Sequence, residues 1–370
     1  MEPVLSNQST DDGFLRFTLS GVNVSIANAI RRTIVGEIPT VVFRTTPHDQ
    51  SRATVHTNTT RMNNELLKQR LSCIPIYIQD TEFPIDDYVV EIQRRNDSDV
   101  IEYVTTGDFR IRDVRNDKYL SKEETSRMFP VCPLTNYHID FARLRPRISD
   151  EIPGEELNIT CGLSVGTAKE DGAFNVASTC AYGATIDPVA ANAALSTRIK
   201  ELKSAGEDAQ VLERTRKDWQ ALDAKRFTKP DSFDFVIETI GVFTNEALVL
   251  KACYVVIGKL RTFQGLVETD GTMMRSLETD NTIEHGYDVS LENEDYTLGK
   301  ILEYVMYSRY FGQSLTYCGF IKPHPHRSIS YLRLGFEREI GKTEVAAYLV
   351  DAATNAIAVF ERIAIEFETV

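Results

Sequence analysis

The chain has 370 residues, 42% of them hydrophobic, and a formal net charge of −13. This length fits about two to three domains, and the acidic balance argues against a protein that wraps nucleic acid through bulk charge. No apolar run approaches the roughly 18–20 residues of a membrane span, and the polar stretch Met1–Asp12 predicts no signal peptide. The six cysteines form no Cys-x-x-Cys pair, which predicts free thiols in a reducing compartment.

The first predicted elements are a short strand and a helix. Leu15, Phe17 and Leu19 alternate with polar residues, as in a half-buried strand, and a polar turn leads into a helix that begins near Ser25 and ends before Pro39. Ser25 is predicted to cap this helix. The small side chain of Ala27 leaves room for a close neighbour on one helix face.

A β-rich block follows, over residues 76–186. A strand at 40–44 and a helix at 63–72, capped by Asn63 or Asn64, precede it. Short alternating runs at 88–92, 100–105, 109–114 and 156–160 predict strands joined by turns.

Residues 188–227 have a different character. They are rich in Ala, Lys, Glu, Arg and Asp at helical spacing, broken at Gly206. This composition predicts two solvated surface helices, docked by the single Trp219.

Two long helices have apolar seams. In the first, Val249, Cys253, Val256, Leu260, Phe263 and Val267 recur at intervals of four and three residues. The final helix repeats this spacing, with a seam that consists of Val345, Leu349, Ala352, Ala356, Phe360, Ile363 and Phe367. Since neither seam can be buried alone, we expect the two helices to pack on each other.

Between the seams, the strand–helix pattern of the N-terminal region returns. An acidic linker is expected at 271–282, and Tyr287, Val289 and Leu291 then alternate as a strand before a helix that begins near Thr297, the predicted cap. In this helix Gly299 stands at the position that corresponds to Ala27 in the first helix. Two such half-units in one chain predict both halves of a pseudo-symmetric dimer.

Residues that could support catalysis are few. The loop with Cys318, His324 and His326 offers a thiol near two imidazoles, which leaves a Cys–His enzyme or a metal site as an alternative. No Gly-rich phosphate loop or His-x-x-x-His helix is present. The sequence does not resemble that of an enzyme, and a stand-alone DNA-binding protein is the other alternative.

Two segments leave an interaction role open beside the ordinary interpretation, which is a solvated helix face for an isolated pair of arginines and a surface loop for the second segment. Arg31 and Arg32 follow Asn28 by one helical turn. The stretch 164–177 combines small residues, the charged run Lys169-Glu170-Asp171 and the aromatic Phe174, which suits a docking loop.

The order of these motifs resembles a known pair of proteins. The stretches Asn23–Arg32, Glu37–Thr40, Asn63–Leu71, Ile74–Ile76 and Lys169–Ser178 resemble the third-largest subunit of eukaryotic RNA polymerase II, which is related to the archaeal D and bacterial alpha proteins. The stretches Glu294–Leu302 and Gly319–Pro325 resemble the eleventh subunit, which corresponds to the archaeal L protein. The fusion of the two resembles the arrangement in large nucleocytoplasmic DNA viruses.

The resemblance implies an α+β fold of two alpha-subunit-type dimerisation modules that form an intramolecular pseudo-heterodimer. The expected domains are a third-subunit-like dimerisation domain (1–47 and 184–270), an inserted β-rich domain (48–183), the linker (271–282) and an eleventh-subunit-like domain (283–370). Cys132, Cys161 and Cys180 lie too far apart to match the four-cysteine zinc loop of eukaryotic third subunits. We therefore expect no zinc, iron–sulfur cluster or other cofactor.

The implied function is a non-catalytic assembly scaffold of a DNA-directed RNA polymerase. The expected partners are the largest and second-largest subunits and small subunits equivalent to the tenth and twelfth. DNA is contacted only through the holoenzyme, no membrane is involved, and the chain alone is monomeric. A viral protein would act in cytoplasmic viral factories and be packaged in the virion; otherwise the expected location is the nucleus.

The resemblance also assigns site residues. Those expected to dock the large subunits are Asn28, Arg31, Arg32, Lys169, Glu170 and Phe174. Those expected in the intramolecular dimer seam are Val256, Leu260, Phe263, Leu298, Leu302, Leu349, Phe360 and Ile363.

Overall fold

The computed structural model describes residues 1–149, 151–277 and 283–368, which fold into two compact units. The first unit contains Met1–Ile34, Thr179–Glu238 and Asn245–Val370, and the second contains Val35–Ser178 and Thr239–Thr244. Helices and strands occur in both units, which confirms the mixed α+β class. None of the helices that the structure describes combines the length and apolar character that a membrane span requires.

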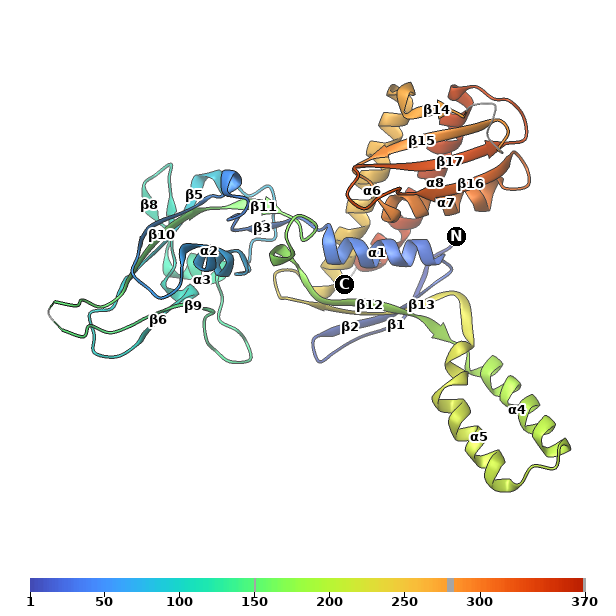
Figure 1. Cartoon of the computed structure of the whole chain (residues 1–370), viewed down its shortest axis with the longest axis horizontal. Coiled ribbons are helices and arrows are strands. Elements are labelled where there is room, and N and C mark those ends of the chain that lie inside the picture. The colour runs from blue at the N-terminus through green and yellow to red at the C-terminus, as the bar shows by residue number, and fades with distance from the viewer. Residues whose placement is uncertain (150, 278–282, 369–370) are drawn as a thin grey trace. The chain divides into compact units, whose positions relative to one another are not determined.

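Two four-stranded sheets are the framework of the first unit (Figure 1). One has the strand order β1-β2-β13-β12 and the other β14-β15-β17-β16. The strands are β1 (Val4–Asp11), β2 (Phe14–Ser20), β12 (Ala177–Ile186), β13 (Thr228–Thr239), β14 (Met274–Ser276), β15 (Gly286–Glu292), β16 (Leu315–Ile321) and β17 (Ile329–Phe336). The alternation in the sequence decides which side chains are buried, and Leu15, Phe17 and Leu19 of β2 are at most 2% exposed.

Each sheet supplies two strands that lead directly into helices. In the first sheet, β2 leads into α1 (Val24–Gly36) and β13 into α6 (Asn245–Thr269). In the second, β15 leads into α7 (Tyr296–Tyr310) and β17 into α8 (Lys342–Glu368). The two strands that precede helices are neighbours in each sheet, so both sheets combine their elements in the same order.

The caps of α1 and α7 differ from the prediction. Asn23 Oδ1 accepts a hydrogen bond from the Ser25 amide at 2.9 Å, and Asp295 Oδ1 accepts one from the Thr297 amide at 2.8 Å. The prediction that Ser25 and Thr297 are the caps is therefore wrong, because both helices begin earlier and the backbone amides of Ser25 and Thr297 are themselves free first-turn amides, which Asn23 and Asp295 satisfy.

The small residue of α7 has the predicted close neighbour. A Cβ atom on Gly299 would lie only 2.2 Å from Cε2 of Phe320 in β16, so the ring packs directly on the helix backbone. Any larger residue at this position would push the ring away.

The two long helices α6 and α8 pack against each other, as their seams predict (Figure 1). Their seam residues are buried, and Leu260 and Phe360 are fully inaccessible to solvent. Polar contacts flank the seam, since Gln264 Nε2 donates to Thr354 Oγ1 at 2.8 Å and Arg261 pairs with Glu361 at 3.1 Å.

The predicted charged helices form a hairpin. They are α4 (Pro188–Ser204) and α5 (Ala209–Ala221), followed by the 3-10 helix η5 (Asp223–Arg226). Gly206 lies between them with φ +82°, a conformation that glycine adopts readily. The Trp219 ring lies against Phe227, with centroids 5.7 Å apart, and so anchors α5 at the base of the hairpin.

The second unit is rich in β-strands. A five-stranded sheet has the order β4-β10-β5-β7-β8, and two strand pairs, β11-β3 and β6-β9, accompany it. The strands are β3 (Thr40–Val42), β4 (Ala53–Asn58), β5 (Tyr88–Arg95), β6 (Glu102–Thr105), β7 (Arg110–Asp113), β8 (Lys118–Tyr119), β9 (Asp140–Leu144), β10 (Glu156–Gly162) and β11 (Ser164–Gly166). The short helices are η1 (His48–Gln50), α2 (Asn64–Ser72), η2 (Ile85–Asp87), η3 (Thr106–Asp108), α3 (Lys122–Met128) and η4 (Gly172–Phe174).

The core of this unit contains a cluster of phenylalanine rings. Phe109 contacts Phe43, Phe129 and Phe141 edge to face, with centroids 5.3–6.5 Å apart. Such pairs add to the free energy of apolar burial. Asn63, one of the two predicted candidates, caps α2 by accepting from the Leu66 amide at 2.8 Å.

The stretch expected as a linker begins with regular structure. The 3-10 helix η6 (Gly271–Met273) follows α6, and β14 then pairs antiparallel with β15, with Met274 opposite Val289. Residues 278–282 of the expected linker lie outside the described residues.

Candidate functional site

The side chains predicted to dock other subunits lie on α1 and in the loop that follows β11. On α1, the Asn28 carboxamide oxygen accepts hydrogen bonds from Arg31 Nε at 3.1 Å and Arg31 Nη2 at 2.9 Å. These bonds hold the Arg31 guanidinium along its own helix, where it is half-buried. An arginine fixed in this way is preorganised to meet a carboxylate of a partner.

Arg32 is used within the first unit. Its Nη2 atom lies 2.7 Å from Asp295 Oδ2, and its Nε atom donates to Thr297 Oγ1 at 2.8 Å. The side chains of Arg32 and Asp295 are 36% and 17% exposed, so the pair is partly shielded from water. Arg32 therefore joins α1 to the N-terminal end of α7.

Lys169 and Glu170 form ion pairs within the second unit. Lys169 Nζ lies 3.2 Å from Glu37 Oε1, and the Lys169 amide donates to the Gly36 carbonyl at 2.8 Å. Glu170 Oε2 lies 2.7 Å from Arg44 Nη2. About half of the surface of each loop side chain is exposed, at 46% for Lys169 and 47% for Glu170, so each presents part of its surface to solvent while its charged group is held in place.

Phe174 is only 2% exposed and supports this loop from within. The Arg44 guanidinium carbon lies 5.7 Å from the centre of its ring, and a Cβ atom on Gly166 would lie 2.8 Å from its Cδ2 atom. The glycine thus makes room for the ring. Its burial limits Phe174 to holding the shape of the loop.

The residues predicted in the dimer seam are all buried in the first unit. Their exposure does not exceed 3% for any of Val256, Leu260, Phe263, Leu298, Leu302, Leu349, Phe360 and Ile363.

The segment with Cys318, His324 and His326 offers no activated nucleophile, and its Cys318 lies in strand β16 instead of the predicted loop. Cys318 Sγ donates to the Glu303 carbonyl at 3.6 Å, and burial raises the pKa of this thiol to about 12. His324 Nδ1 accepts from the backbone amide of His326 at 3.1 Å. No group of three or more residues capable of holding a metal ion occurs in the described parts of the chain. A neutral thiol is a poor nucleophile, so the loop does not support the enzyme alternative.

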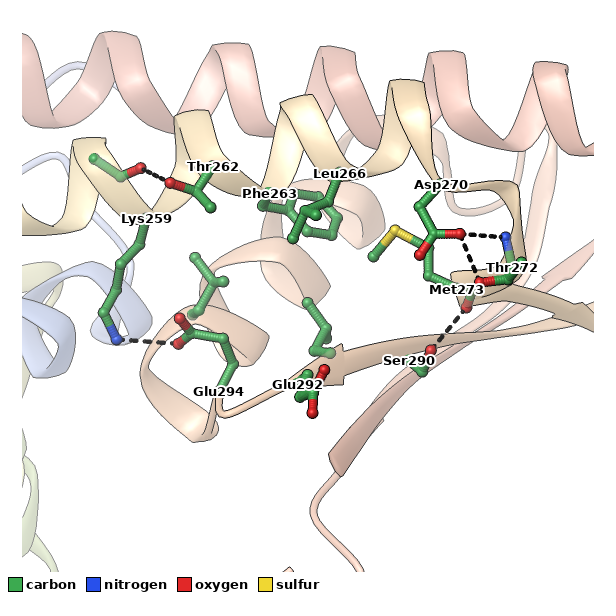
Figure 2. A pocket seen from close by; sticks show the side chains of 13 residues that line it. Lys259, Thr262, Phe263, Leu266, Asp270, Thr272, Met273, Ser290, Glu292 and Glu294 are labelled. Carbon is green, nitrogen blue, oxygen red and sulfur yellow. Dashed lines mark hydrogen bonds and ion pairs between the residues drawn. The ribbon is translucent and has the colours of Figure 1, made fainter. Parts of the chain in front are cut away.

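Two features of the first unit were not singled out in the sequence. One is Asp295, the partner of Arg32, which its position two residues before Thr297 marks as a capping residue. The other is a cavity of about 520 Å³ beside α6 (Figure 2). Segments that are distant in the sequence line this cavity, so no local pattern in the sequence points to it.

Comparison with known proteins identifies the family. The family model described as the RNA polymerase Rpb3/Rpb11 dimerisation domain matches residues 16–260, more than half of the chain. The DNA-directed RNA polymerases I and III subunit RPAC1 of Homo sapiens is 26% identical over 308 residues, which cover 71% of this chain and 84% of that protein.

An archaeal relative is similar to a shorter part of the chain. The DNA-directed RNA polymerase subunit Rpo3 of Pyrococcus furiosus is 32% identical over 104 residues, which cover 27% of this chain and 36% of that protein. The chain therefore belongs to the RNA polymerase Rpb3/Rpb11 dimerisation domain family and is an Rpb3-like, non-catalytic assembly subunit of a DNA-directed RNA polymerase.

Proposed function

We propose that this chain carries both dimerisation halves in one polypeptide and so acts as a complete assembly scaffold, equivalent to the fused third and eleventh subunits. The observation that carries the proposal is the repeated architecture of the first unit. The two sheets combine their strands in the same order, and in each sheet two strands lead directly into helices. The family model matches residues 16–260, so the repeat of this architecture after residue 283 lies outside the matched range. The proposed halves are the third-subunit-like part (1–47 and 184–270) and the eleventh-subunit-like part (283–370).

Contacts between these two parts support the proposal. The α6–α8 seam contributes apolar burial, and each large buried side chain contributes roughly 1.5–3 kcal/mol. Arg32 bonds to Asp295 and Thr297, and Lys259 Nζ lies 3.1 Å from Glu294 Oε2. Strand β14, which follows α6 and η6, pairs with β15 of the other half. This combination of a large apolar seam and polar contacts at its edge is typical of permanent interfaces.

The scaffold is proposed to dock the largest and second-largest polymerase subunits, together with small subunits equivalent to the tenth and twelfth. Asn28 and Arg31 supply a preorganised cationic contact, and Lys169 and Glu170 supply a second, ion-paired one. Arg32 and Phe174 take supporting roles in this proposal, because their side chains are engaged within their own units. A viral origin, and with it a location in viral factories and virions, is part of the proposal that rests on the fusion.

Co-expression tests the proposed function. The tagged full chain should co-purify with the largest and second-largest subunits from its own source at a fixed stoichiometry that survives gel filtration. Recovery of the chain alone, with both large subunits expressed and soluble, would contradict the scaffold proposal.

A stand-alone DNA-binding protein predicts a different result. It would bind duplex DNA without the large subunits, with an affinity that falls steeply as salt is raised. We expect no such binding by the isolated chain, since its formal net charge is −13.

A further inference from the structure

The strand β16 leaves one edge of its sheet open. In the part of the chain that the structure describes, it pairs with β17 on one side and with no strand on the other. This strand has seven residues, whereas β14 at the opposite edge of the sheet has three. A long open edge is a template for pairing with another extended chain.

A side chain of α7 satisfies one amide of this open edge. Glu303 Oε2 accepts a hydrogen bond from the Phe320 amide at 2.8 Å, so this amide points away from β17. Backbone amides alternate between the two sides of a strand, so the Cys318 amide points to the same open edge. Lys300 Nζ lies 2.9 and 2.7 Å from the two oxygens of the Glu303 carboxylate and neutralises it. The carboxylate thus takes the role of the carbonyl that an added strand would supply.

A groove of about 540 Å³ lies between α1 and α7, and Cys318 of β16 is part of its lining. Three tyrosine rings also line this α1–α7 groove, those of Tyr182, Tyr304 and Tyr307, and Tyr307 is 49% exposed. Aromatic rings beside an open edge offer apolar surface to the alternate side chains of an added strand. Asn28, one of the proposed docking residues, lines the same groove, so the groove is continuous with the proposed docking site on α1.

We propose that an extended segment of the second-largest polymerase subunit enters the α1–α7 groove and pairs with β16 as an additional strand. The Phe320 amide would then donate to a carbonyl of that segment, and Glu303 would keep Lys300 as its partner. Alternate apolar side chains of the segment would pack on the three tyrosine rings. This inference rests on the proposed function, because it specifies how the partner engages the site that contains Asn28.

Hydrogen exchange tests the inference on the full chain, alone and in complex with the large subunits. In the complex, the backbone amides of residues 316–321 should exchange at least about tenfold more slowly than in the free chain, whereas those of β14 should not change. In the free chain, Glu303→Ala should raise the exchange rate of the Phe320 amide roughly tenfold, because the amide loses its acceptor. Glu303→Gln keeps an acceptor and is the matched control.

Two variants at one position separate strand pairing from ordinary surface contact. Cys318→Pro removes an amide from the open edge and costs no bond to β17, because that amide points away from β17. It should lower the recovery of the second-largest subunit in co-purification at least about threefold. Cys318→Ala, which keeps the amide, should give wild-type recovery. Circular dichroism establishes that both variants are folded, and the exchange measurement on the unmodified chain does not depend on them.

The outcomes separate this inference from the proposed function. A complex that forms while residues 316–321 exchange as fast as in the free chain would overturn the inference and leave the proposed function intact. Equal recovery with Cys318→Pro and Cys318→Ala would do the same. Protection of β16 that arises in a dimer of the free chain would also overturn it, because the added strand would then belong to a second copy. Failure of the chain to capture any large subunit would overturn both.

Discussion

Arg31 and Arg32 are neighbours in the sequence, but their guanidinium groups have different partners. Arg31 is held by Asn28 of its own helix, and Arg32 by Asp295 and Thr297 of a distant segment. Successive residues on a helix point about 100° apart, which allows one arginine to serve the fold and the other an external partner. Charge reversal at the two positions should therefore have separable effects.

Arg31→Glu is predicted to leave the chain folded and to prevent its capture of the second-largest subunit. A half-buried helix charge contributes on the order of 0.5 kcal/mol to stability, while a reversed charge at a docking face costs several kcal/mol of binding. Co-purification of the second-largest subunit is the measurement. Arg327→Glu, an exposed charge reversal elsewhere in the same unit, is the control. Wild-type recovery with Arg31→Glu would refute the docking assignment.

Arg32 is predicted to stabilise the first unit. A double-mutant cycle between Arg32→Met and Asp295→Asn, which keeps an N-capping oxygen, should give a coupling energy of about 1 kcal/mol in urea unfolding. The exposed pair Arg198–Glu201 on α4 should give about 0.3 kcal/mol in the same kind of cycle. Equal coupling in the two cycles would mean that the Arg32 pair does not join the two segments.

Residue-level predictions from the sequence succeeded where the cause is local. Asn63, one of the two predicted candidates, caps α2 and directly precedes the helix. The assignments of Ser25 and Thr297 as caps failed, since both residues lie in the first turn of their helices, where Asn23 and Asp295 accept from their backbone amides. The partner of Arg32 lies 263 positions away, a pairing that no local pattern encodes. The burial of Phe174 likewise depends on Arg44 and Gly166.

At the scale of elements, the spacing of the apolar residues predicts both α6 and α8 and their packing on each other. Apolar residues at intervals of three and four place one stripe along each helix, and two such stripes bury each other. The strand β14 was missed because it has three residues and exists through its bonds to β15, while its own sequence reads as a polar turn. The groove beside α6 was missed for the same reason, since segments distant in sequence build its two walls.

Leu260→Ala tests the α6 seam. Leu260 is fully buried, and its truncation should lower the free energy of unfolding by about 2–5 kcal/mol through lost burial and the remaining cavity. Leu266→Ala, at a position 49% exposed on the same helix, is the control and should cost less than about 1 kcal/mol. Chemical denaturation measures both. Similar losses for the two variants would contradict the burial of the seam.

At the scale of the whole molecule, buried thiols connect stability to pH. Burial raises the pKa from 9.0 to about 12 for each of Cys161, Cys180, Cys253 and Cys318. Below about pH 9 the thiols are neutral in both the folded and the unfolded chain. Between about pH 9 and 12 they ionise only in the unfolded chain, so the unfolded state is favoured increasingly as pH rises.

The free energy of unfolding should consequently fall above about pH 9, by about 1 kcal/mol per buried thiol at pH 10. Cys253→Ala should make this fall less steep by the contribution of one thiol, even though the variant is less stable at neutral pH. Cys73→Ala, at an exposed thiol, is the control. Urea unfolding at a series of pH values measures the slopes, and identical slopes for Cys253→Ala and the wild type would contradict the assignment.

The central claim concerns the whole first unit, namely that one polypeptide contains both dimerisation halves. The most direct measurement is to insert a protease recognition sequence between residues 277 and 283, cleave the folded chain, and analyse it by gel filtration. We predict that the uncut chain is a monomer and that the two fragments elute together, because the α6–α8 seam, the Arg32 pair and the β14–β15 pairing all cross the cut. Fragments that separate without denaturant, or an uncut chain that forms a stable homodimer, would contradict the account.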